Sequence, residues 1–332
     1  MILSINLLIV ISALLISGLI IKLLFYRGCV KSIENKHVVI TGGSSGIGKS
    51  VAIIAARKGA HVTIIARDVE KLEKAKYEIM QACKNRDTQR VEYLPLDITK
   101  DYEEIQKAFM ELEKTMGSIY MLINCAGSSM CAKIEDTSTS DLRKIMDLNF
   151  FGTYNCIKAV VQSMKTAKDG IIVLTGSAAS LLGVYGFSAY CSSKFALRGL
   201  AETLSMELTP YNISVTLSLP PDTDTPGFAE EELTKLPETK LISQSSGLVK
   251  PEVVADILLK DALNGKYFST VGLEGFLLSI VCCGMSPFTI SEILIQMITM
   301  GFIRFISVFY IISFQRIILK CMKTRDMNKK SE

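Results

Sequence analysis

Four polar residues between positions 149 and 194 have the types and spacing needed for proton transfer at a carbonyl group. Tyr190 and Lys194 are four residues apart, which places both on one face of a helix. A tyrosine of ordinary pKa, about 10, is a weak acid–base catalyst at neutral pH, and a neighbouring ammonium lowers that pKa. Ser177 ends an apolar run and is suited to hold the carbonyl oxygen. We expect Asn149, in a predicted helix, to hold a water in a proton relay.

The segment 41–48, TGGSSGIG, has the pattern of a turn that binds a pyrophosphate. Its glycines allow a tight turn and a close approach of the backbone, and the following helix offers free N–H groups at its N-terminus. A glycine triad alone is weak evidence, since many tight turns need glycine, but this one stands between the first predicted strand and the first predicted helix. The predicted phosphate-binding residues are Gly42, Ser44, Ser45, Gly46, Ile47 and Gly48.

The ends of the next predicted strands indicate which cofactor binds. Arg67 stands where an acidic residue would select NAD, and Lys71 follows one helical turn later. A guanidinium binds phosphate oxygens through two donors, so this pair predicts NADPH, with Ser44 adding a hydrogen bond. The alternative is that both cations are solvated charges at a helix start. Asp97 is suited to accept the adenine amino group or to cap the next helix, and Asn124 begins a small-residue segment expected to lie close to the cofactor.

These residues require strands and helices that alternate along the chain. Apolar runs at 37–42, 61–67, 91–97, 120–127, 170–177 and 213–221 predict six strands, with helices between them at 49–59, 71–84 and 102–116, among others. The strands are continuously apolar, as expected when helices cover both faces of a parallel sheet. We therefore predict an α/β fold of the Rossmann type, a doubly wound parallel sheet, with the catalytic domain at 37–270.

Composition excludes several classes of protein. The 332 residues allow one doubly wound domain, and the formal net charge of +4 comes without a basic stripe, which argues against nucleic acid binding. The nine cysteines are odd in number and form no CxxC pair, so neither a disulfide framework nor a metal site is expected. Hydrophobic residues make up 49% of the chain, which is high for a soluble enzyme, and the excess lies at the two ends. This distribution indicates membrane segments.

The two apolar ends are predicted to contact a membrane. Residues 1–26 read as an uncleaved transmembrane anchor, with a removed signal peptide as the alternative, and the cations that follow place the rest in the cytosol. Residues 271–319 are apolar and precede a basic tail at 320–332. Within them, 288–301 and 302–319 read as one long span, two short spans or a hairpin, and 274–285 as a possible soluble helix over the sheet.

Taken in order, the glycine turn, the Asn-Cys-Ala-Gly segment, Ser177 and the YxxxK pair resemble the short-chain dehydrogenase/reductase family over residues 37–265. The resemblance implies a catalytic tetrad of Asn149, Ser177, Tyr190 and Lys194, with Tyr190 and Lys194 also meeting the cofactor. One segment departs from the family: Pro220-Pro221 stands where Pro-Gly is usual, which stiffens the loop beside the nicotinamide. Thr223 and Thr225 remain available for the carboxamide.

Segment 220–231, residues 194–200 and both apolar ends resemble a branch of this family that reduces long-chain ketosphingoid bases at the cytosolic face of the endoplasmic reticulum membrane. That resemblance implies such a base as substrate, with membrane lipid and a possible homo-oligomer as partners. We hypothesise that Glu230, Glu231 or Glu232, carried by a mobile loop at 225–246, or else Asp222 or Asp224, meets the substrate ammonium. The alternative is a solvated acidic lid. The rival functions are reduction of a steroid or retinoid carbonyl and a non-catalytic cofactor-binding scaffold.

Overall fold

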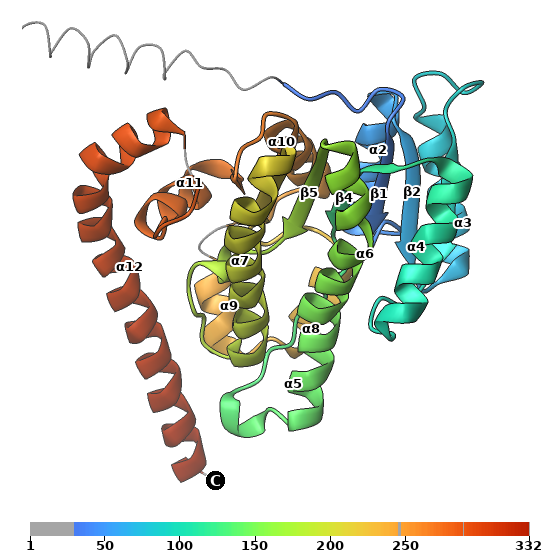
Figure 1. The fold of residues 1–332 in the computed structure, drawn as a ribbon. Helices are drawn as coiled ribbons and strands as arrows, with labels where there is room; N and C mark the ends of the chain where they lie inside the picture. Colours follow the sequence, from blue (N-terminus) through green and yellow to red (C-terminus); the bar gives the residue numbers. More distant parts are fainter. Residues whose placement is uncertain (1–29, 245–246, 288, 332) are drawn as a thin grey trace, which may run out of the picture.

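Seven parallel strands form one sheet in the computed structural model, which describes residues 30–244, 247–287 and 289–331 (Figure 1). The strand order is β3-β2-β1-β4-β5-β6-β7, so the chain reverses its direction of winding between β1 and β4. This is the doubly wound arrangement expected from the sequence. The strands are β1 His37–Thr41, β2 His61–Ala66, β3 Val91–Pro95, β4 Ile119–Asn124, β5 Gly170–Thr175, β6 Ile213–Leu219 and β7 Phe268–Thr270.

All six predicted strands are confirmed, and the seventh was missed. The central strands β1 and β4 are buried along their whole length, which explains their unbroken apolar sequences. Strand β7 has only three residues, Phe-Ser-Thr, and pairs with the end of β6. A segment this short gives no periodicity that could predict a strand.

Helices cover both faces of the sheet, with a separate apolar core on each side (Figure 1). On one face α2, α3 and α10 pack against side chains such as Val38, Ile40 and Ile123. On the other face α4, α6 and α7 pack against side chains such as Val39 and Leu122. The covering helices are α2 Gly46–Arg57, α3 Val69–Gln81, α4 Tyr102–Met116, α6 Thr153–Ala167, α7 Ser188–Leu208 and α10 Pro251–Leu263.

Short helices lie between the strands on the side of the predicted site. A π-helical segment, η2 Asp147–Gly152, joins α5 Thr139–Met146 to α6 without a break. The further short elements are the 3-10 turns η1 Ile134–Asp136, η3 Ala178–Ser180 and η4 Thr209–Tyr211. The prediction of a mobile loop at 225–246 is wrong, because most of this segment forms two helices, α8 Pro226–Thr234 and α9 Pro237–Ser243. Each of these helices has proline at its N-terminal end, where proline stabilises a helix start.

The C-terminal region forms two helices rather than a hairpin of spans. Helix α11, Gly272–Val281, packs next to β7, and α12, Ile290–Ser331, is one continuous helix. Part of it, Ser291–Arg325, is long and apolar enough to cross a membrane, so α12 is a candidate membrane anchor. The predicted N-terminal anchor at 1–26 lies outside the described residues.

Candidate active site

An open cleft of about 1090 Å³ lies at the carboxyl ends of β1 to β4, where the winding of the sheet reverses. Ligands bind at this position in doubly wound sheets. The cleft brings together ten of the residues that the sequence predicted to bind a cofactor: Gly42, Ser44, Ser45, Gly46, Ile47, Gly48, Arg67, Lys71, Asp97 and Thr225. Residues 125–127 of the expected small-residue segment also line the cleft. The sequence did not single out three further apolar residues of its wall, namely Leu96, Ile98 and Leu148.

The glycines of the first turn are required by close contacts of the backbone. A Cβ atom on Gly42 would lie 2.7 Å from the backbone nitrogen of Ala126, and the φ of Gly42 is +66°. A Cβ on Gly48 would lie 2.3 Å from the carbonyl oxygen of Gly42. Helix α2 then starts after Ser45, whose side chain makes no capping hydrogen bond. The first N–H groups of α2 therefore stay available for an anion in the cleft.

Two cations and two carboxylates lie at the far end of the cleft. Arg67 is exposed where β2 ends, and Lys71, in the first turn of α3, lies 3.4 Å from Asp68. Asp97 accepts hydrogen bonds from the backbone and hydroxyl of Thr99. Burial opposes ionisation of Asp97, but these hydrogen bonds and the charges of Arg67 and Lys100 together outweigh it and lower the pKa. Asp97 does not cap the next helix, because α4 begins one turn later with Asp101 as its N-cap residue.

Ser177, Tyr190 and Lys194 meet beside the cleft. Tyr190 and Lys194 lie one turn apart on α7, and the Ser177 side chain is close enough to the Tyr190 hydroxyl to favour its ionised form. The Lys194 ammonium donates to the carbonyl oxygen of Thr175 at 2.9 Å and lies 5.7 Å from the centroid of the Tyr190 ring. The arrangement can present a phenol, a hydroxyl and an ammonium to one carbonyl oxygen.

The expected lowering of the Tyr190 pKa is wrong. Burial raises that pKa above the ordinary range, since it disfavours the phenolate more than the nearby Ser177 side chain favours it. The same burial lowers the pKa of Lys194 to about 8. A neutral phenol at physiological pH is still the form that can donate a proton.

Asn149 fixes the segment after β4 to helix α7. Its side-chain oxygen accepts from the Ser128 backbone N–H, and its amide group donates to the Ser128 carbonyl and to the Ser193 hydroxyl, each at 2.9 Å. A Cβ on Gly127 would lie 3.1 Å from the Asn149 oxygen and 3.5 Å from the Lys194 nitrogen. Asn149 therefore stands next to Lys194, as its predicted relay role requires, and that role stays a prediction.

Three predicted cofactor residues have structural partners. Asn124 is buried and donates to the carbonyl oxygen of Val173, so it joins β4 to β5 and does not line the cleft. The buried Thr223 donates to the Pro221 carbonyl, and its neighbours pair with Val249. Thr225 caps α8 by accepting from the Phe228 backbone.

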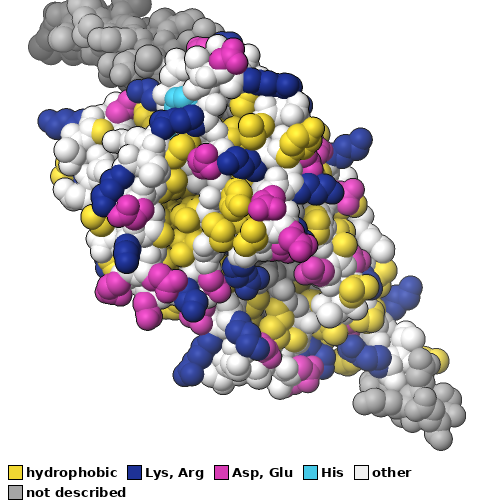
Figure 2. Space-filling view, turned by 90° about the vertical axis from the view of Figure 1, so that its right-hand side faces the viewer, with side chains coloured by type: hydrophobic (Ala, Val, Ile, Leu, Met, Phe, Trp, Pro, Cys, Tyr) yellow, Lys and Arg dark blue, Asp and Glu magenta, His cyan; other side chains and the backbone are white. Residues whose placement is uncertain are grey.

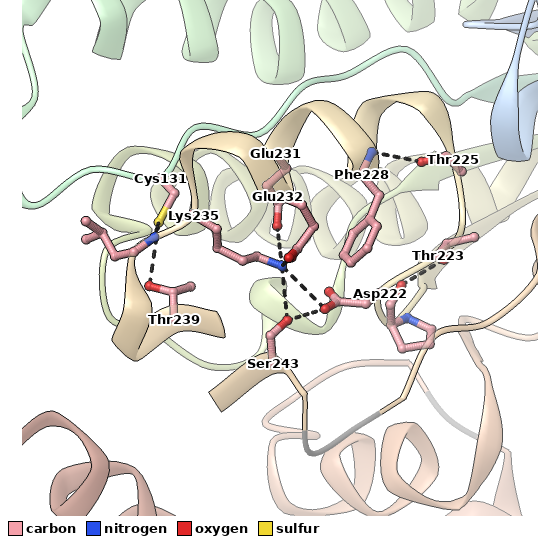
Figure 3. Close-up of polar contacts among 12 residues, drawn as sticks. Cys131, Asp222, Thr223, Thr225, Phe228, Glu231, Glu232, Lys235, Thr239 and Ser243 are labelled. Carbon is pink, nitrogen blue, oxygen red and sulfur yellow. Dashed lines mark hydrogen bonds and ion pairs between the residues drawn. The ribbon is translucent and has the colours of Figure 1, made fainter. Parts of the chain in front are cut away.

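Sequence reasoning missed a buried lysine, Lys235, whose side chain lies among acidic side chains (Figure 3). The Lys235 side chain is 0% exposed, and its nitrogen lies 2.6 Å from Glu232, 2.9 Å from Glu231 and 3.6 Å from Asp222. The charges of Glu231 and Asp222 also raise the pKa of Tyr190. We call these four residues the Lys235 cluster. The i to i+3 and i to i+4 spacing of Glu232 and Glu231 to Lys235 is the signal that predicts two of its pairs.

The short chain dehydrogenase family profile matches residues 36–235. The chain is 46% identical to the 3-dehydrosphinganine reductase of Danio rerio over 301 residues, 90% of each protein, and 46% identical to the 3-ketodihydrosphingosine reductase of Mus musculus over 292 residues, 88% of each. A plant relative, 3-dehydrosphinganine reductase TSC10B of Arabidopsis thaliana, is 40% identical over 84% of this chain and 81% of its own.

Solved structures agree on the fold. The structure of ElxO with NADP bound has a TM-score of 0.58 and 29% identity, covering 67% of this chain and 89% of its own. Levodione reductase has a TM-score of 0.64 at 21% identity, over 70% of this chain and 91% of its own, which supports the fold alone. With the profile covering more than half of its residues, this chain belongs to the short-chain dehydrogenase family.

Proposed function

We propose that this protein uses NADPH to reduce 3-ketosphinganine to sphinganine, a step of sphingolipid synthesis. The grouping of Ser177, Tyr190 and Lys194 at the edge of a cleft fit for a dinucleotide is the observation that carries the proposal. Relatives that match about nine tenths of the chain at 46% identity are named as reductases of this ketone.

The residues of the cleft fit NADPH. The crowded glycine turn and the uncapped start of α2 suit the pyrophosphate, and Arg67 with Lys71 suits the 2′-phosphate of the adenosine. Asp97 is held at a position suited to the adenine amino group. NADP is bound in the similar structure of ElxO.

The chain's own residues supply the proton and the electrostatic stabilisation. Bound NADPH supplies a hydride to the carbonyl carbon. The Tyr190 phenol donates its proton to the carbonyl oxygen, which thereby becomes the hydroxyl of the product. Ser177 donates a hydrogen bond to the same oxygen while negative charge develops on it. The Lys194 ammonium then stabilises the phenolate left on Tyr190 until a proton returns.

An apolar cluster next to Tyr190 suits the alkyl chain of the substrate, and nearby carboxylates suit its ammonium. Tyr190 packs against an apolar cluster that includes Val184, Phe187 and Leu236. Of the five acidic residues in the original hypothesis, Asp222 and Glu231 are the two whose charges reach Tyr190, whereas Asp224 and Glu230 are exposed. We therefore assign the ammonium to the Asp222–Glu231 side of the Lys235 cluster, where three carboxylates face one lysine.

The proposed location is the endoplasmic reticulum membrane, with residues 37–270 as the catalytic domain in the cytosol. Helix α12 supports membrane contact, because the most apolar 18 residues within Ser291–Arg325 have a mean hydropathy of 1.8 and only 6% of them are buried. A homo-oligomer in that membrane is part of the proposal.

The test is turnover of 3-ketosphinganine by the detergent-solubilised protein, followed as NADPH oxidation with the product identified by mass. Sphinganine should form, and Tyr190→Phe should abolish its formation while NADPH still binds. Tyr77→Phe, at an exposed tyrosine on α3, is the matched control and should behave as the parent. No product from a parent protein that binds NADPH would refute the substrate and favour a steroid or retinoid carbonyl.

The ammonium assignment has a separate test. Glu231→Gln should raise KM for 3-ketosphinganine and leave unchanged the KM for its N-acetylated analogue, which carries no charge. An equal change for both ketones would contradict the assignment without touching the proposed reaction.

A further inference from the structure

Helix α12 contacts the catalytic domain near both of its ends (Figure 1). Just before it starts, Arg198 on α7 donates to the Cys283 carbonyl at 3.1 Å and to the Ser286 hydroxyl at 3.3 Å. Near its other end, Arg325 lies 2.6 Å from Glu238 on α9. Glu238 is fully buried, and its carboxylate forms this ion pair with Arg325. The helix therefore runs alongside the domain rather than away from it.

Between Ile298 and Phe309, the side of α12 that faces away from the protein is an apolar stripe. Ile298, Phe302, Phe305 and Phe309 recur at helical spacing and are 80%, 69%, 62% and 57% exposed. On the opposite side Ile303 is buried. By contrast, the surface at the α3 end of the sheet carries Lys, Arg, Asp and Glu side chains spread among the hydrophobic ones (Figure 2). An uncovered apolar stripe of this length needs a partner.

Arg304 favours a lipid surface over a membrane crossing. It stands near the midpoint of the apolar stretch between Ile290 and Leu319, and it is exposed. In a helix that crosses the bilayer, Arg304 would lie near the bilayer centre, which costs about 2.5–3.5 kcal/mol. In a helix that lies flat, the same guanidinium reaches the headgroups. Arg316, Lys320 and Lys323 then add cations that attract anionic lipids.

We propose that α12 lies in the plane of the lipid bilayer, with its apolar stripe among the acyl chains and Arg304 at the headgroups. The bilayer is thus the partner of this surface, and the protein is attached to one leaflet through α12. Helix α9, which Arg325 contacts, then lies next to the membrane surface and close to the apolar cluster around Tyr190. The inference concerns attachment and does not depend on the proposed reaction.

The absence of tryptophan from the sequence makes a direct depth measurement possible. Ile298→Trp, Phe309→Trp and Leu319→Trp each give one fluorophore along the exposed side of α12, over about 32 Å at 1.5 Å per residue. Each full-length variant is placed in vesicles of brominated phosphatidylcholine and phosphatidylserine, with bromine at a shallow or a deep acyl position. Tyr77→Trp, on exposed α3, is the control and should not be quenched.

A flat helix predicts the same shallow depth, about 5–10 Å into the interface, for all three variants. Quenching should then favour the shallow bromine equally at each position. A deeper Phe309→Trp, about 15 Å in, with shallow ends would overturn the proposal in favour of a spanning helix. Absence of quenching at all three positions would also overturn it and would indicate that protein, such as a second copy, covers the stripe. Because fluorescence needs no turnover, the Tyr190→Phe background gives the same answer.

Discussion

Lys235 forms ion pairs with all three carboxylates of the Lys235 cluster. Replacing it with a neutral residue tests how much these ion pairs contribute to the stability of the protein. In Lys235→Met the side chain keeps its apolar length but loses ion pairs of 2.6, 2.9 and 3.6 Å. Removing one partner of a buried ion pair costs about 3–5 kcal/mol. Glu232 and Asp222 are 38% and 33% exposed, so water can solvate their charges after Lys235 is removed. The loss of stability should therefore lie at the lower end of this range. We expect a loss of about 3 kcal/mol.

The assay is thermal unfolding of the purified protein at low and at high salt. At about 2–4 °C per kcal/mol for a domain of this size, Tm should fall by ~6–12 °C. Lys240→Met, on the neighbouring α9, is the matched control because Lys240 has no ion pair with the described residues, and its Tm should barely change. Adding Glu231→Gln to Lys235→Met should recover part of the lost stability, since one uncompensated carboxylate is removed.

Equal Tm values for Lys235→Met and Lys240→Met would refute this reasoning. So would additive losses in the double variant, because they would mean that Glu231 and Lys235 do not interact. In either case the cluster would be a set of hydrated surface charges.

Three further changes give separate outcomes. Arg67→Ala should raise KM for NADPH by ~10- to 100-fold, the loss of a charged hydrogen-bonded contact, and leave KM for NADH unchanged; an equal rise for both would contradict the 2′-phosphate assignment. Because burial lowers the pKa of Lys194 to about 8, kcat/KM for the ketone should fall as pH rises through that value, and a flat profile to pH 10 would exclude the ammonium from the mechanism. Burial also lowers the pKa of His37 to about 4, so the unfolded chain takes up a proton that the folded chain does not, and stability should fall as pH drops from about 6.5 to about 4. His37→Gln should remove that slope in Tm against pH more than His61→Gln does, and identical slopes would contradict it.

The sheet and the cofactor cleft were predictable because the sequence contains local signals for them. Continuous apolar runs mark strands buried on both faces, and the glycine turn marks the point where backbone atoms approach within van der Waals distance. The positions of Arg67 and Asp97 were predictable because both residues come just after a strand, and the carboxyl ends of parallel strands lie at the same edge of the sheet. Local signals of this kind need no knowledge of which segments pack together.

The rest of the site depends on long-range packing. The pKa of Tyr190 is set mainly by burial, and burial comes from segments distant in sequence, so a rule based on the neighbouring Lys194 gave the wrong direction. Asp222 joins the Lys235 cluster from a separate loop, which no spacing rule predicts. Helices α8 and α9 are short and polar, and their sequences show little helical periodicity. The sequence therefore predicts a loop in this region.

The π-helical segment Asp147–Gly152 makes the position of Asn149 sensitive to chain length. Such a segment is an α-helix with one residue inserted, and it occurs mostly at functional sites. Deleting one residue between Asn149 and Thr153 would restore regular α-helical geometry at little expense in helicity, but it would turn Asn149 by about 100° relative to α6. Its hydrogen bonds to Ser128 and Ser193 would then be lost. The length of this segment therefore sets the direction in which Asn149 points, so a one-residue deletion should disturb the site while leaving the helix itself intact.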